Sequence, residues 1–180
     1  MDTPRPENQG IPIVTLVRTS RALTARQFAI QFADSFLVGL PVKDDEDEDG
    51  EDWVYQTTYI RSLPSTDGRM AFIDVKGTTV FPLRKARKGP FADTILVGRA
   101  ASNDVCIEHG SISKLHARIH RLKEGAWRLS DAGSLNGTKV NDRIITADTP
   151  LRDGDHVVFG SLGFEVYEAW RLHQLLQRLR

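Results

Sequence analysis

Three short motifs between residues 98 and 137 contain side chains that suit the binding of an anion. They read Gly98-Arg99, Ser113-Lys114-Leu115-His116 and Ser134-Leu135-Asn136-Gly137. An arginine presents a planar fork of donors that stays charged, a lysine presents a mobile positive charge, and serine and asparagine add neutral donors. Taken singly each motif is unspecific, and an Asn-Gly pair by itself indicates only a hairpin turn. Their order along the chain is what carries information.

Catalytic interpretations of the same residues meet chemical objections. Ser113, His116 and Asp131 are the types found in a hydrolytic triad, but Ser113 lacks the glycine-flanked turn that exposes a nucleophile. His116 and His120 share one face of a strand with Arg118 between them, and a guanidinium is an unfavourable neighbour for a metal cation. The sequence has no phosphate-cradling glycine-rich loop that ends in lysine and serine or threonine. We therefore expect no enzymatic activity, no metal and no cofactor.

Charge and cysteine content argue against a nucleic-acid-binding protein and against a disulfide-stabilised one. The chain has 24 basic and 24 acidic side chains, so its formal net charge is zero, which argues against bulk nucleic-acid binding. The basic run at residues 84–88 is too short for a nucleic-acid patch and is expected to be a solvated loop. The single cysteine, Cys106, excludes an intrachain disulfide and lies in an apolar run typical of a core position. With no signal-peptide pattern and no run near the ~20 apolar residues of a membrane helix, a soluble, cytoplasmic protein that binds no membrane is expected.

The N-terminal part of the chain predicts a small unit of mixed α and β structure. Residues 11–18 are apolar and β-branched, which favours a strand. Thr24 and Gln27 form a capping-box pattern at the start of a helix, and apolar residues recur every three or four positions over 28–37. Gly39 is expected to end this helix, because glycine tolerates the left-handed conformation of a C-terminal cap.

The rest of the chain predicts an acidic loop and then a series of short strands. Residues 44–52 comprise eight acids and one glycine, which repel one another and favour an exposed loop. Beyond them, alternating apolar runs are broken by glycine, asparagine and aspartate, as in antiparallel sandwiches. The expected strands are Trp53–Ser62, Met70–Lys76, Thr79–Leu83, Thr94–Val97, Asp104–Ile107, Ala117–Leu122, Ala126–Ser130, Thr138–Val140, His156–Phe159 and Gly163–Tyr167.

A short amphipathic helix is predicted over residues 169–180. Trp170, Leu175, Leu176 and Leu179 fall roughly on one face of it. We expect this face to dock on the sandwich, and a surface for a partner is the alternative.

Taken together and in this order, the three motifs resemble the forkhead-associated (FHA) family, whose members are small β-sandwiches that bind phosphothreonine peptides through loops at one end. The likeness runs from about Arg69 to Glu168 and includes further matching stretches at 103–105, at Asp131 and at 151–155. With the flanking elements, the expected fold is mainly β: an FHA-type antiparallel β-sandwich with an α+β N-terminal extension and a short C-terminal helix.

The resemblance also implies roles for individual residues. In the family, the arginine of the Gly-Arg pair and the serine of Ser-x-x-His contact the phosphate, and these are Arg99 and Ser113 here. Lys114 would add a second positive charge, and Asn136 would hold the backbone of the bound peptide. A phosphorylated threonine carries nearly two negative charges and three acceptor oxygens, so these donors suit it.

The same resemblance assigns supporting roles and reveals two departures. Gly98 and Gly137 would permit turns that a side chain would block, and His116 would brace the binding loops. Lys114 stands where arginine or asparagine is common in the family. Leu135 stands where a small or hydroxylated residue is frequent, which makes the rim of the site more apolar.

The resulting hypothesis is a phosphothreonine-dependent adaptor module in serine/threonine-kinase signalling, with a threonine-phosphorylated protein as its partner. The alternative is a phosphate-independent assembly or scaffold protein that uses the FHA frame and the terminal helices. The expected division of the chain is an N-terminal extension at 1–66, a sandwich at 67–168 and the C-terminal helix at 169–180.

Overall fold

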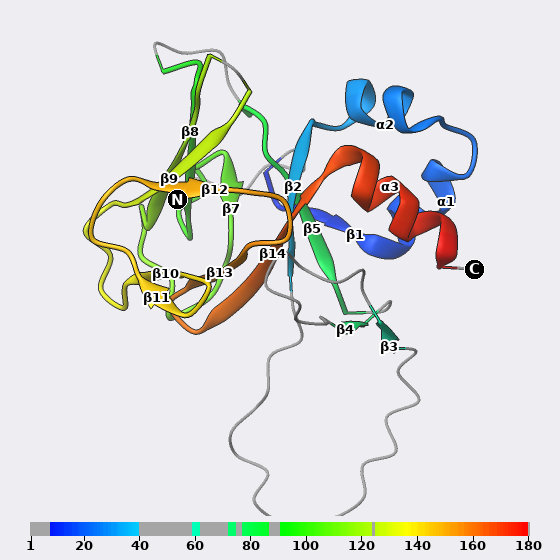
Figure 1. Cartoon of the computed structure of the whole chain (residues 1–180). Coiled ribbons are helices and arrows are strands. Elements are labelled where there is room, and N and C mark those ends of the chain that lie inside the picture. Colours follow the sequence, from blue (N-terminus) through cyan, green and yellow to red (C-terminus); the bar gives the residue numbers. More distant parts are fainter. Residues whose placement is uncertain are drawn as a thin grey trace, which may run out of the picture.

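The chain folds into three layers over the residues that the structure describes. The structure is a computed structural model, and it describes residues 8–39, 59–61, 72–74, 77–86, 91–123 and 125–179. Within these ranges a five-stranded sheet, a seven-stranded sheet and a group of three helices pack on one another (Figure 1). The seven-stranded sheet is the middle layer, because its strands contribute to two separate cores.

The seven-stranded sheet is antiparallel throughout and joins distant parts of the chain. Its central pair is β2 with β14, in which Leu37 lies opposite Val166. In spatial order the strands are β1 (Ile11–Pro12), β5 (Thr79–Pro82), β2 (Ser35–Gly39), β14 (Leu162–Glu168), β13 (His156–Phe159), β10 (Thr138–Val140) and β11 (Arg143–Ile144).

The five-stranded sheet is also antiparallel, except for its last pair. In spatial order its strands are β12 (Thr149–Leu151), β9 (Trp127–Asp131), β8 (Ala117–Arg121), β6 (Thr94–Gly98) and β7 (Val105–Cys106), with β6 and β7 parallel. A separate two-stranded pair consists of β3 (Tyr59–Arg61) and β4 (Phe72–Asp74). Because the sheets share a core, the loops at one end of them are held by packed strands.

The core between the two sheets follows the two-residue period of its strands. On β8, Ala117 and Ile119 are fully buried, whereas Arg118 and His120 on the opposite face are only partly covered. Cys106, next to the core residue Val105, is buried as a free thiol, as predicted.

The helices cover the other face of the seven-stranded sheet. They are α1 (Ile13–Ser20), α2 (Ala25–Gln31) and α3 (Ala169–Arg178). The predicted capping box is present at the start of α2. The Thr24 hydroxyl accepts a hydrogen bond from the backbone amide of Gln27 at 3.3 Å, and the side-chain Oε1 of Gln27 accepts one from the backbone amide of Thr24 at 2.9 Å. The expected docking of the C-terminal helix is confirmed, because Leu172, Leu175 and Leu176 of α3 are buried. In the described part of the chain, no helix has the length and apolar character needed to span a bilayer.

Two elements near the N-terminus differ from the prediction. Residues 11–18 form only the two-residue β1 and then enter α1, because Ile13, Leu16 and Val17 recur at helical spacing and face one core. The helix expected to run from the Thr24 cap to Gly39 ends at Gln31, and Ser35–Gly39 form β2 instead. Sheet pairing on both sides overrides the local preference there, since β2 lies between β5 and β14.

Other differences concern elements that the pattern missed or misplaced. Strands β11 and β12 were not predicted, and both are at most three residues long. Trp170 was expected on the docked face of the last helix, but it is 55% exposed. Leu172, one turn away from Leu175 and Leu176 at helical spacing, occupies that face instead.

The predicted division of the chain does not follow the sheets. β2 comes from the range 1–66, yet it pairs with β14 from the range 67–168. Whether the ranges 1–66, 67–168 and 169–180 fold as separate units stays a prediction. The predicted acidic loop at 44–52 lies outside the described residues.

Candidate functional site

Four loops meet at the end of the sandwich where β6 finishes and β8 begins. The amide of Arg99 donates to the carbonyl of Ser113 at 3.0 Å, and the amide of Ala100 donates to the carbonyl of Lys114 at 3.2 Å. The side chain of Asn103 donates to the same Lys114 carbonyl at 2.6 Å. Backbone bonds thus clamp the loop that carries Arg99 onto the loop that carries Ser113.

Gly98 is required for this close approach. A β-carbon at position 98 would collide with the backbone carbonyl oxygen of Lys114 and with the side-chain nitrogen, Nδ2, of Asn103. Any larger residue would push the two clamped loops apart. The structure therefore gives a steric reason for the glycine that precedes Arg99.

Arg99 and Lys114 present exposed cations at this end of the molecule. Among the described residues, neither side chain forms an ion pair with a carboxylate. The Arg99 backbone is fixed by its bond to Ser113, so the base of the side chain is held while its guanidinium stays accessible. An anion reaching these loops would find donors that are not already used.

Ser113 is fixed by its own hydroxyl. Its Oγ accepts a hydrogen bond from the amide of Leu135 at 3.0 Å, which ties the Ser113 loop to the loop that carries Asn136. A serine hydroxyl that accepts in this way still has its proton to donate. The bond therefore orients Ser113 as a donor toward a ligand and places Leu135, which is 89% exposed, beside it.

His116 is buried beneath the loops and connects them. Its Nδ1 accepts from the Ser113 amide at 3.1 Å, and its Nε2 lies 3.1 Å from the carbonyl of Gly137. These partners specify a neutral ring with the proton on Nε2. The ring packs edge-on against Phe159, and its centroid lies 5.6 Å from that of the phenyl ring. Burial lowers the pKa of His116, and the bond to Gly137 together with the charge of Asp131 opposes this only in part.

The geometry of His116 also bears on the triad interpretation. Both ring nitrogens are engaged by backbone groups, so neither is directed at the Ser113 hydroxyl as a general base. No cluster of three or more histidine, cysteine or acidic side chains suited to a metal occurs in the described ranges.

Asp131 organises the loop that carries Asn136. Its carboxylate accepts hydrogen bonds from the amides of Gly133 and Ser134, both at 2.9 Å, and from the hydroxyls of Ser134 and Thr138, both at 2.6 Å. Burial alone would raise the pKa of Asp131, but these four donors outweigh it and hold the pKa below its ordinary value. Gly137 completes the turn with a φ of 77°, a conformation that favours glycine.

Ser111 positions Asn136, and the motifs gave no sign of it. The Asn136 side-chain amide donates to the Ser111 carbonyl at 2.8 Å. The Ser111 hydroxyl lies 2.8 Å from His109 Nδ1 and accepts from both the amide and the hydroxyl of Ser161. No sequence signal could have found this network, because Ser161 reaches the site only through the fold.

Asn8 is a second contributor that sequence reasoning missed. Its side-chain amide donates to the carbonyls of Ala101 and Asn103, both at 2.9 Å, and its own carbonyl accepts from the Cys106 amide at 2.8 Å. The N-terminal segment therefore supports the loop that follows Arg99.

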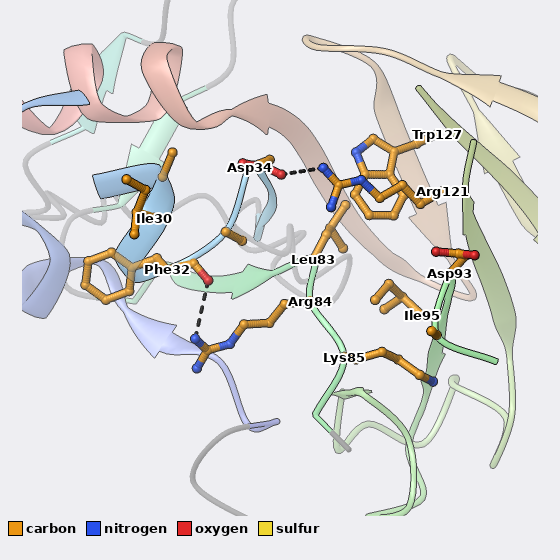
Figure 2. Close-up of a pocket in the computed structure, with 13 residues that line it drawn as sticks. Ile30, Phe32, Asp34, Leu83, Arg84, Lys85, Asp93, Ile95, Arg121 and Trp127 are labelled. Carbon is orange, nitrogen blue, oxygen red and sulfur yellow. Dashed lines mark hydrogen bonds and ion pairs between the residues drawn. The ribbon is translucent and has the colours of Figure 1, made fainter. Parts of the chain in front are cut away.

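A cavity of about 370 Å³ lies at the other end of β8 (Figure 2). Leu83, Ile95 and Trp127 supply apolar walls. Arg121, the last residue of β8, pairs with Asp34 at 2.5 Å on its rim, and Arg84 donates to the Phe32 carbonyl at 3.4 Å. Because His116 lies just before β8 and Arg121 ends it, this cavity is not part of the Arg99 site.

The expected basic loop at 84–88 is only partly a solvated loop. Arg84 is exposed, but Lys85 pairs with the buried carboxylate of Asp104 at 2.8 Å. Residues 87 and 88 lie outside the described ranges.

Comparison with known proteins finds a family match within the sandwich. Residues 95–160 match the model of the FHA domain. An FHA domain-containing protein of Arabidopsis thaliana is 39% identical over 70 residues, which cover 37% of this chain and 18% of that protein. The glycogen accumulation regulator GarA of Mycolicibacterium smegmatis is 36% identical over 67 residues, which cover 37% and 41%. The oxoglutarate dehydrogenase inhibitor of Corynebacterium glutamicum is 34% identical over 67 residues, which cover 37% and 46%. The chain thus spans less than half the length of these relatives.

Solved structures of similar proteins include further FHA domains. The FHA domain of CT664 from Chlamydia trachomatis is 20% identical, with a TM-score of 0.42, over 74% of this chain and 97% of that one. EmbR from Mycobacterium tuberculosis, solved with a low-affinity phosphopeptide, is 18% identical, with a TM-score of 0.42, over 86% of this chain and 28% of that one.

Proposed function

Because the chain contains an FHA domain over residues 95–160, and FHA domains are phosphopeptide-binding modules, we propose that it is a phosphothreonine-dependent adaptor in serine/threonine-kinase signalling. Arg99, Ser113 and Lys114 bind the phosphate. Asn136 holds the backbone of the bound peptide. The partner is a protein phosphorylated on threonine, and the chain catalyses no reaction on it.

One observation carries this proposal. The backbones of Arg99 and Ser113 are bonded to each other at 3.0 Å, while the Arg99 guanidinium has no carboxylate partner among the described residues. The Ser113 hydroxyl accepts from Leu135 and keeps its proton for a ligand. A cation and a hydroxyl donor held side by side by rigid loops suit the oxygens of a phosphate monoester.

The supporting residues act through the loops and do not touch the ligand. Gly98 lets the two loops approach, Gly137 completes the Asn136 turn, and His116 joins the two turns through its ring nitrogens. This arrangement keeps donors in place before the ligand arrives, which lowers the entropic cost of binding.

The alternative, a phosphate-independent scaffold, is favoured by a different region. Trp170 and Ile30 are 55% and 78% exposed beside cavities that α2 helps to line. These apolar side chains suit a protein surface rather than a phosphate.

A binding experiment separates the two functions. A degenerate phosphothreonine peptide library and its unphosphorylated and phosphoserine counterparts are measured against the full chain by fluorescence anisotropy. We expect binding of the phosphothreonine pool only. The phosphoserine pool tests whether the threonine methyl group matters.

The variant Arg99→Ala tests whether the phosphate binds at Arg99. Losing a charged hydrogen bond removes roughly 1.5–3 kcal/mol, so the affinity for the best phosphopeptide falls at least about tenfold. Arg18→Ala, an exposed arginine on α1, is the matched control and leaves the affinity unchanged. Equal binding of phosphorylated and unphosphorylated pools would instead support the scaffold.

A further inference from the structure

The outer face of the five-stranded sheet is cationic. Partner register and alternating burial place every second cross-strand pair, with both of its residues, on this face. Two pairs on it join Arg118 to Leu96 and Ser130, and two more join His120 to Thr94 and Arg128. The outward residues that β12, β9, β8 and β6 contribute to this face up to Leu96 are Thr94, Leu96, Arg118, His120, Arg128, Ser130 and Pro150. None of these seven is a carboxylate.

The two arginines of this face have no ion-pair partner among the described residues. The Arg128 guanidinium contacts only the backbone carbonyl of Asp148, at 3.5 Å, and no salt bridge joins it to the Asp148 carboxylate. Asp131, at the end of β9, falls in the inward-facing series with Trp127 and Leu129, and its carboxylate is used by the loop beyond. The positive charge of the face is therefore not neutralised from within.

His120 holds the middle of this face in place. Thr94 Oγ1 lies 3.1 Å from its Nδ1, and Ser130 Oγ lies 3.5 Å from its Nε2. These contacts link β6, β8 and β9 across the outer surface. Arg118 and Arg128 flank a fixed polar centre, so the cationic residues keep their spacing.

The cationic face is continuous with the proposed phosphate site. The ladder between β6 and β8 pairs Leu96 with Arg118. One step further along, the His116 amide donates to the Val97 carbonyl, and beyond that the Arg99 amide donates to the Ser113 carbonyl in the proposed phosphate site. Strands rise about 3.3 Å per residue, so the level of Arg118 lies within about 7 Å of the level of His116 along β8, and that of His120 is about 7 Å further.

We propose that this face binds acidic residues that flank the phosphothreonine of the partner. The proposal rests on the function proposed above and adds the chemical class of the partner segment: a phosphothreonine with a cluster of aspartate or glutamate within about four to six residues of it. An extended segment covers about 3.3–3.6 Å per residue, so four residues reach from the phosphate loops to the level of Arg118 and His120.

Arginine suits this task on a flat sheet. Arg118 lies opposite Leu96 and Arg128 lies opposite Pro150 in the register. An arginine can lay its aliphatic stem along such apolar neighbours while its guanidinium fork reaches solvent and matches carboxylate geometry. Each exposed pair contributes little on its own, and the attraction is screened within about 8 Å at physiological ionic strength. The face therefore adjusts preference among phosphorylated partners, and the phosphate site supplies the main affinity.

The test compares three phosphothreonine peptides on the full chain. They share one core and carry four acidic residues on the N-terminal side, four on the C-terminal side, or four alanines on both sides. The double variant Arg118→Gln/Arg128→Gln removes the face. The control, Arg18→Gln/Arg178→Gln, removes the same charge from exposed positions on α1 and α3.

We expect one acidic peptide to bind the wild-type chain more tightly than the alanine peptide, with the gain shrinking as salt rises. The face variant should lose about twofold to fivefold per arginine for that peptide and nothing for the alanine peptide, whereas the control should lose nothing for either. Equal affinities of all three peptides for the wild type, or equal losses in the face and control variants, would overturn the inference and leave the proposed function standing. Absence of binding by any phosphothreonine peptide would overturn the proposed function and the inference with it.

Discussion

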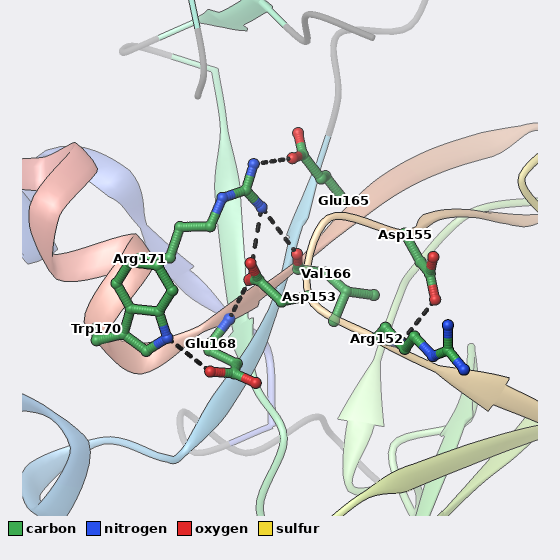
Figure 3. A network of polar contacts seen from close by, with 8 residues as sticks. All are labelled: Arg152, Asp153, Asp155, Glu165, Val166, Glu168, Trp170 and Arg171. Atoms are coloured by element: carbon green, nitrogen blue, oxygen red, sulfur yellow. Dashed lines mark hydrogen bonds and ion pairs between the residues drawn. The ribbon is translucent and has the colours of Figure 1, made fainter. Parts of the chain in front are cut away.

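The two faces of the seven-stranded sheet use charge in opposite ways. On the side of the sandwich, the loops expose Arg99 and Lys114 and bury a neutral histidine, His116. On the side of the helices, the buried guanidinium of Arg171 pairs with the buried carboxylate of Glu165 and the partly buried carboxylate of Asp153 (Figure 3). One end of the molecule keeps its cations available for a ligand, and the other uses its cation to hold the chain together. The role of a charged residue in this chain therefore depends on whether it has an ion-pair partner, and its residue type alone does not indicate that role.

The buried network centres on Arg171 of α3. Its Nη2 lies 2.8 Å from the Glu165 carboxylate, its Nη1 lies 3.5 Å from Asp153, and its guanidinium carbon lies 4.3 Å from the centre of the Tyr167 ring. Burial raises the pKa of both Glu165 and Asp153, and the guanidinium opposes this. For Arg171 burial acts to lower the pKa, but its carboxylate partners and Tyr167 outweigh burial and raise it. The helix, the sheet and the loop before β13 are thereby joined by one side chain.

Removing the Arg171 side chain gives the largest expected effect. Arg171→Ala leaves the 2%-exposed Glu165 without its cation, and breaking a buried pair in this way costs about 3–5 kcal/mol. Urea unfolding followed by circular dichroism measures the loss. Phosphopeptide affinity of the folded variant should not change, because the network lies on the other face of the sheet. A loss of affinity in protein that is still folded would show that the two faces are coupled.

His116→Ala comes next, because it removes the link inside the phosphate loops. The Ser113 amide and the Gly137 carbonyl lose their partners, which costs about 1–3 kcal/mol of stability. Thermal unfolding measures this, and anisotropy should show weaker phosphopeptide binding as the loops loosen. An unchanged melting temperature combined with lost binding would make His116 a contact residue instead of a brace.

Ser113→Ala should have a smaller effect, mainly on binding, because it removes one donor to the phosphate and one of the bonds that join the loops. A neutral donor contributes about 0.5–1.5 kcal/mol, so the affinity for a phosphothreonine peptide should fall about twofold to tenfold while Arg99 remains. Isothermal titration calorimetry measures the change. If Ser113→Ala weakens binding more than Arg99→Ala does, the hydroxyl and not the guanidinium is the principal phosphate donor.

The pH dependence of stability should show the smallest difference. The folded chain holds the pKa of His116 below the value of about 6.5 expected for an unfolded chain, so the unfolded chain takes up the proton first as pH falls. The contribution of His116 is therefore complete above that pH and is lost as pH falls from about 6.5 toward the folded pKa. Unfolding curves at neutral and mildly acidic pH should show a larger acid loss in the wild type than in His116→Ala. Parallel losses would mean that His116 titrates normally.

The sandwich strands could be predicted from the sequence because local signals agree with the tertiary ones. The runs Thr94–Val97, Ala117–Leu122 and His156–Phe159 match β6, β8 and β13 to within one residue at each end. Each is a short run rich in apolar residues, and burial alternates along the strand that it forms. The strand β2 could not be found, because its residues alternate between two cores and so read as a helical face.

The candidate site was predictable where the motifs carry the chemistry, and only there. Arg99, Ser113 and Asn136 are brought to one end of the sandwich by loops that bond to one another, and their binding roles stay predictions. Asn8 and Ser111 could not be predicted, because each acts through partners that are distant in sequence or set by the fold.

The pairing of β2 with β14 sets an order of events during folding. Leu37 and Val166 meet in the central pair of the middle layer, so the sheet cannot close until residues up to Glu168 have been synthesised. Pairings between residues so far apart in sequence form slowly, because loop-closure entropy is spent before their contacts are gained. On the ribosome, the strands of the matched FHA segment can pair among themselves, but one edge of β13 stays unpaired until β14 has been made. Strand β14 therefore completes the scaffold on which the earlier loops depend.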